Sequence, residues 1–102
     1  MPDVSLELHL TRRCIATEAK RAYERAMSHY FRAPDSTELE QHIELLKELL
    51  EQVDLPALRG AHPELRAGGG PVRILREGDE IRIEVEGRVL HSQTLPPSDQ
   101  EG

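Results

Sequence analysis

Residues 36–53, STELEQHIELLKELLEQV, decide the fold of this chain. Apolar residues recur there in a 4-3-4-3 spacing, which keeps them on one side of a helix. They are Leu39, Ile43, Leu46, Leu50 and Val53. Leu45 and Leu49 widen this apolar face, and His42 lies between the two rows. The stretch therefore predicts an amphipathic helix over 36–53 that supplies much of the core, since burying each Leu or Ile stabilises by roughly 1.5–3 kcal/mol.

A first helix is predicted over residues 12–32, directly before this stretch. Its apolar side contains small alanines, which let a second helix approach closely. Pro34 disfavours helical geometry at Ala33 and ends this helix. Asp35 followed by Glu38 resembles a capping box and starts the next helix. The short connection predicts an antiparallel hairpin of two helices.

Four segments alternate apolar and polar residues with the period of two that is typical of half-buried strands. They are residues 3–10, 72–76, 80–85 and 88–92. The pair Glu86-Gly87 suits a tight hairpin, because glycine tolerates positive φ. These patterns predict an α+β fold in the order β-α-α-β-β-β, with an antiparallel sheet of three to four strands packed on the helical hairpin. The position of the N-terminal strand in the sheet stays open.

We expect a single α+β domain over residues 1–95. Residues 54–71 contain three prolines and four glycines, which predicts a long loop before a β-meander over 72–92. Three leucines are expected to hold parts of this loop to the core: Leu55, Leu58 and Leu65. Gly68 to Gly70 is expected to be its most mobile part. Residues 96–102 are expected to form a disordered tail.

The composition limits the classes of function. The net charge of −6 and the presence of only three aromatic residues argue against nucleic-acid binding. A single cysteine excludes an intramolecular disulfide and a multi-cysteine metal site within one chain. No apolar run approaches the roughly 20 residues of a membrane span, and the N-terminus does not resemble a signal peptide. We therefore expect a cytoplasmic protein with no membrane contact.

Cys14 is a candidate reactive thiol, because a helix N-terminus beside Arg12 and Arg13 lowers the pKa of a thiol. The favoured alternative is an unreactive thiol at an exposed helix start. The five histidines are scattered and lack the spacing of a metal site. A site shared by His9 and His91 requires that their strands pair. The sequence predicts no metal and no cofactor.

Arg21, Arg25 and Arg32 lie on one side of the first helix, opposite its apolar face. They are candidates for contact with an anion or a nucleic acid. The favoured alternative is pairing with Glu18 and Glu24, which lie three or four positions from these cations.

The chain contains no nucleophile elbow, phosphate loop or dinucleotide motif, and no catalytic residues are predicted. We expect a small non-enzymatic protein that acts through protein–protein contact, first of all with itself. A nucleic-acid-binding regulator that uses the basic first helix is the alternative. A thiol- or metal-dependent enzyme ranks third.

The apolar arc of the second helix spans about 160°, whereas a helix in such a hairpin needs about 100°. Leu45 and Leu49 are therefore expected near solvent, with His42 at the border. An exposed apolar patch usually marks an interface, and a twofold contact is the commonest way to bury it. This predicts a homo-oligomer, a dimer above all. In the alternative, the segment from Leu55 to Leu65 folds over the same patch and leaves a monomer.

Overall fold

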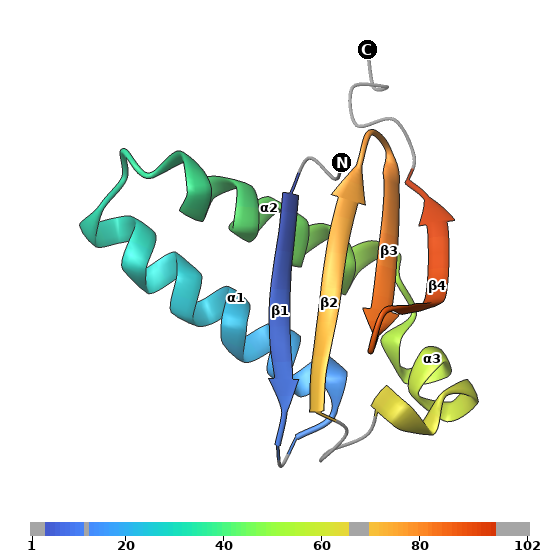
Figure 1. Cartoon of the computed structure of the whole chain (residues 1–102). Coiled ribbons are helices and arrows are strands. Elements are labelled where there is room, and N and C mark those ends of the chain that lie inside the picture. The colour runs from blue at the N-terminus through green and yellow to red at the C-terminus, as the bar shows by residue number, and fades with distance from the viewer. Residues whose placement is uncertain (1–3, 12, 66–69, 96–102) are drawn as a thin grey trace.

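A computed structural model describes residues 4–11, 13–65 and 70–95. One antiparallel sheet has the strand order β1-β2-β3-β4. Its strands are β1 (Val4–Leu10), β2 (Gly70–Glu77), β3 (Glu80–Val85) and β4 (Arg88–Thr94). The N-terminal strand is an edge strand beside β2, with Leu6 opposite Ile74. The predicted α+β fold is confirmed (Figure 1).

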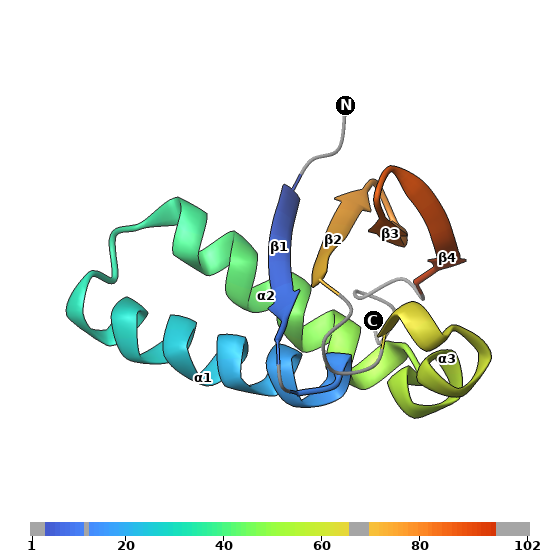
Figure 2. The same ribbon diagram turned by 60° about the horizontal axis from the view of Figure 1, so that its bottom comes forward.

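Two antiparallel helices, α1 (Ile15–Arg32) and α2 (Thr37–Gln52), lie against one face of the sheet (Figure 1). They do not end at the border of the sheet. The turn between them projects well past β1, as two views of the ribbon show (Figures 1 and 2). The outer halves of both helices therefore pack mainly on each other.

The predicted start of α2 is wrong by one residue. Ser36, not Asp35, is the N-cap, and its side-chain oxygen accepts the Leu39 N–H at 3.2 Å. The chain turns first, with the Ser36 N–H donating to the Ala33 carbonyl at 3.1 Å. Because Leu39 and not an acid occupies the third helical position, the return bond of a capping box cannot form.

Aliphatic side chains fill the space between the sheet and the helices. Ile74, Ile81 and Ile83 of the sheet are fully buried, as are Ile15 of α1 and Leu49 of α2. The other face of the sheet is charged, as the period of two predicts. There the register places Glu7 opposite Arg73 and Arg73 opposite Glu84.

The segment predicted as a long loop contains a helix, α3 (Leu55–Ala61), and a 3-10 turn, η1 (Pro63–Leu65). The Asp54 carboxylate caps α3 by accepting the Ala57 N–H at 3.2 Å, and a proline occupies the first turn. Both are helix-start signals. Leu55, Leu58 and Leu65 are buried as predicted. Gly68 and Gly69 lie outside the described residues, so their predicted mobility stays untested.

The β3–β4 connection is the predicted tight hairpin. Glu86 and Gly87 both have positive φ, 53° and 79°, which is the backbone of a type I′ turn. Leu95, directly after β4, is buried in the core, and its N–H donates to the Asp79 carbonyl at 2.6 Å. The predicted tail, residues 96–102, lies outside the described part of the chain.

Candidate functional site: the outer face of the helical hairpin

The predicted interface on α2 is placed wrongly. Leu45 and Leu49 are 2% and 0% exposed, and His42 on the same side of the helix is half-buried. The row that contains Leu45 and Leu49 faces the sheet. The row of Ile43 and Leu50, roughly 120° further around the helix, borders α1 and is only half-buried. The wide apolar arc is thus used within the chain, one row on the sheet and one toward α1.

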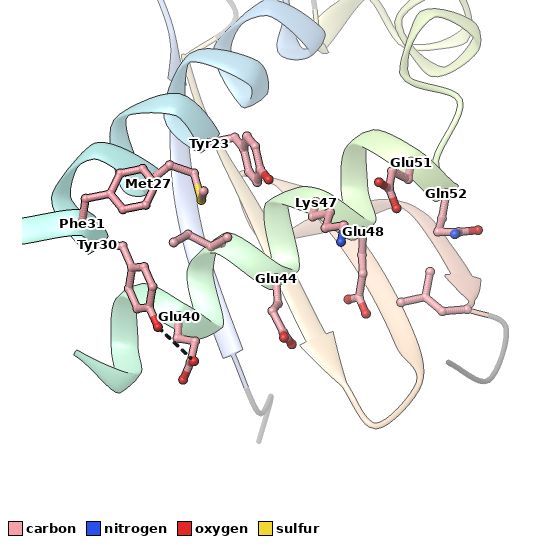
Figure 3. A pocket seen from close by; sticks show the side chains of 12 residues that line it. Tyr23, Met27, Tyr30, Phe31, Glu40, Glu44, Lys47, Glu48, Glu51 and Gln52 are labelled. Atoms are coloured by element: carbon pink, nitrogen blue, oxygen red, sulfur yellow. Dashed lines mark hydrogen bonds between the residues drawn. The ribbon is translucent and has the colours of Figure 1, made fainter. Parts of the chain in front are cut away.

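Another surface is open to solvent. It lies between α1 and α2, and side chains of both helices line it (Figure 3). It encloses a cavity of about 670 Å³, which we call the outer groove. Its apolar lining comes mostly from α1: Tyr23, Met27, Tyr30 and Phe31, with Ile43 of α2 and Leu95 after β4. Its polar lining comes from α2: Glu40, Glu44, Lys47, Glu48, Glu51 and Gln52.

The apolar side of the outer groove follows a helical ridge. Tyr23, Met27 and Phe31 occur at every fourth position of α1 and share one side of it. Phe31 is 75% exposed. Val89 is the other exposed large apolar side chain among the described residues, and it is less exposed than Phe31. Tyr30 beside it is half-buried. The every-fourth spacing was visible in the sequence, but nothing there indicated that Phe31 would lack a cover.

The carboxylates on the acidic side of the outer groove differ in their interaction partners. Glu40 accepts a hydrogen bond from the Tyr30 hydroxyl at 3.3 Å, and its negative charge raises the pKa of Tyr30 (Figure 3). Glu48 forms an ion pair with Arg76 of β2, which links α2 to the sheet. Glu44 and Glu51 have no ion pair and no hydrogen bond from their side chains in the described part of the chain. Their charges are therefore available to a partner.

Cys14 is the half-buried N-cap of α1. A hydrogen bond with the Thr17 hydroxyl, at 3.5 Å, is the main cause that holds the pKa of the thiol below its ordinary value. The backbone of Thr17 and the cation of Arg59 act in the same direction. Arg13 instead pairs with Glu18 at 3.6 Å, and Arg12 is not among the described residues. The thiol has no general base beside it in the described structure, so it is not assembled into a catalytic pair.

His9 and His91 do not come together. They lie on β1 and β4, the two edge strands, with β2 and β3 between them. His9 contacts Glu7 at 3.4 Å, and His91 contacts Gln93 at 2.8 Å. Within residues 4–11, 13–65 and 70–95, no group of three or more metal-ligating side chains occurs.

Arg21, Arg25 and Arg32 are exposed on α1, as predicted from the pattern. The expected pairing with Glu18 is wrong, because Glu18 pairs with Arg13. None of the three arginines forms an ion pair with another described residue. They lie on the side of α1 that is turned away from the outer groove, so the two charged surfaces are separate.

A protein-family model matches residues 4–86. The chain belongs to this uncharacterised family. The matched region of the family runs from β1 to the β3–β4 turn and includes both helices that build the outer groove. Searches of curated proteins and of solved structures gave no match. None of the helices in the described parts of the chain combines the length and the apolar character that a membrane crossing requires.

Proposed function

We propose that this family member is a non-enzymatic protein that acts by protein–protein contact, and that the outer groove is its contact surface. The observation that carries the proposal is Phe31, which is 75% exposed on an arm that projects past the sheet. Exposed aromatic side chains next to other apolar groups are typical of interfaces, where they dominate the binding energy. Met27 and Tyr30 extend the apolar surface beside it.

The chemistry of the groove supports contact rather than catalysis. Its described lining contains carboxylates, one lysine, one glutamine and tyrosine hydroxyls, but no serine, cysteine, threonine or histidine. The serine, threonine and cysteine nucleophiles and the histidine base of the common catalytic pairs are therefore not among its described lining residues. The polar groups follow one side of α2 over several turns instead of converging on a point.

Contact with a second copy, expected from the sequence, is one form of this proposal. Because Leu45 and Leu49 are buried, a homodimer would have to use the outer groove or another surface. A twofold contact through the groove would bring the same acidic row from each copy into one interface. Like charges across an interface disfavour association. We therefore rank contact with a different protein above self-association.

Photocrosslinking in the native host tests the proposed surface. p-Benzoylphenylalanine placed at position 31 is expected to give one discrete adduct, because that side chain would lie inside the contact. Val89 on β4, 51% exposed, is the matched control position and is expected to give none. An adduct with twice the mass of the chain would identify self-association. The absence of any adduct from position 31, or the same pattern from position 89, would contradict the proposal.

Nucleic-acid binding is the second candidate function. It is supported by the three unpaired arginines on α1, Arg21, Arg25 and Arg32. The net charge of −6 opposes it, since the attraction of phosphates depends on positive charge. A nanomolar affinity for mixed-sequence DNA that falls steeply with salt and is lost in Arg21→Gln/Arg25→Gln would reverse this order.

A further inference from the structure

A contact surface does not by itself identify the class of its partner, but the outer groove has a defined shape and charge. Resting on the proposed function, we propose that the groove binds an amphipathic helix with a basic flank, supplied by another protein. The apolar side of that helix would cover Met27 and Phe31, and its lysines or arginines would face Glu44 and Glu51 of α2.

The shape of the groove favours a helix as occupant. It lies between two antiparallel helices, whose side-chain ridges accept a third helix by ridges-into-grooves packing. The ridge from Tyr23 to Phe31 is about 12 Å long, at 1.5 Å per residue. Two to three turns of a partner helix match that length. The described groove lining offers no strand edge, which an extended peptide would need for main-chain pairing.

The charge of the groove selects a basic partner. Among its described lining residues are four carboxylates and one ammonium group. The ion pair between Glu48 and Arg76 neutralises one carboxylate, and the Tyr30 hydroxyl already binds Glu40. Glu44 and Glu51 keep unpaired charges on the rim. Complementary charges there give specificity and a faster approach of the partner.

A second copy of this chain does not supply such a helix. Most of the basic residues on its described helices are on α1, where Arg21, Arg25 and Arg32 are flanked by Ser28 and His29 rather than by apolar side chains. The apolar side of α1 is already used against α2 and in the groove itself. The basic and apolar surfaces of α1 therefore cannot enter one groove together.

A fluorescence-anisotropy titration of the full chain tests the inference. The probe is a labelled peptide of about 18 residues, or five helical turns, with leucines on one side, lysines beside them and alanines elsewhere. The second peptide has glutamate in place of every lysine, and the third has the lysine composition with the leucines shuffled off one face. We expect the lysine peptide to bind about tenfold more tightly than either of the others.

Two double variants with the same change in net charge separate the groove from the rest of the surface. Glu44→Gln/Glu51→Gln is expected to weaken binding of the lysine peptide about three- to tenfold, because exposed ion pairs are lost. Glu84→Gln/Glu86→Gln, on the sheet and its turn, is expected to leave the affinity within about twofold. Equal losses from both variants would mean non-specific attraction and would overturn the inference.

The outcome also separates this inference from the proposed function. If the lysine and glutamate peptides bound with equal affinity, or if neither bound, a basic helical partner would be rejected. If position 31 still formed its crosslink in the host, the contact function would stand with a partner of another kind. If position 31 formed no crosslink either, both the partner class and the contact function would be rejected.

Discussion

At the scale of single residues, the apolar pattern does not say which neighbour covers each side chain. Leu49 and Phe31 both lie on apolar arcs of their helices, yet they are 0% and 75% exposed. The sequence predicts the arcs correctly, because they depend only on helical periodicity. The open patch was predicted at Leu45 and Leu49, which are buried. The sequence pattern does not show which side of α2 faces the sheet, because the packing of the whole core decides it. Phe31 was missed because the apolar face predicted for the first helix did not include it.

Leu49→Ala separates a core leucine from an interface leucine. The substitution is expected to lower the free energy of unfolding by about 2–5 kcal/mol, because it leaves a cavity in the core. Chemical denaturation at two protein concentrations measures this loss, and the midpoint is expected not to depend on concentration. Phe31→Ala, the exposed control, is expected to change stability by no more than about 0.5 kcal/mol. A midpoint for the unsubstituted chain that rises with protein concentration would instead favour a subunit interface.

At the scale of elements, the sequence shows that a helix starts near residue 36, but it does not show which residue caps it. The start of α2 was placed at Asp35, and the structure places the cap one residue later, at Ser36. Both residue types are good caps, so only the backbone turn at 33–36 decides between them. The helix α3 was missed although Asp54 and Pro56 are start signals, because glycines and prolines around it favoured a loop. Its seven residues are too few for a clear helical period.

Ser36→Ala is expected to destabilise the chain by about 0.5–2 kcal/mol, because the Leu39 N–H loses its acceptor. Asp35→Ala is the matched control and is expected to change stability by no more than about 0.5 kcal/mol. Thermal or urea denaturation of the two variants compares them directly. A larger loss from Asp35→Ala than from Ser36→Ala would restore the capping box that the sequence suggested.

At the scale of the whole molecule, the antiparallel sheet, the helical hairpin and the charged open face of the sheet follow from periodicity alone. The overhang of the hairpin past β1 does not, because it depends on how the helices cross the sheet (Figures 1 and 2). One end of the outer groove, at Phe31 and Glu40, lies on that overhang, whereas the other end reaches Gln52 at the end of α2 and Leu95 after β4. Of the acidic residues of the groove, Glu40, Glu44 and Glu51 are exposed, and Glu48 is half-buried beside Arg76. Their position beside an uncovered aromatic ridge appears only in three dimensions.

Mapping of backbone amide chemical shifts by NMR, during titration with the lysine peptide, tests whether the outer groove is the contact surface. We expect the largest changes in two segments, residues 23–31 of α1 and 40–51 of α2, which line the groove. The amides of Arg73 and Glu84, on the open face of the sheet, should change little. Changes centred on the sheet or on residues 15–21 of α1, with residues 23–31 and 40–51 unaffected, would show that the outer groove is not the contact surface.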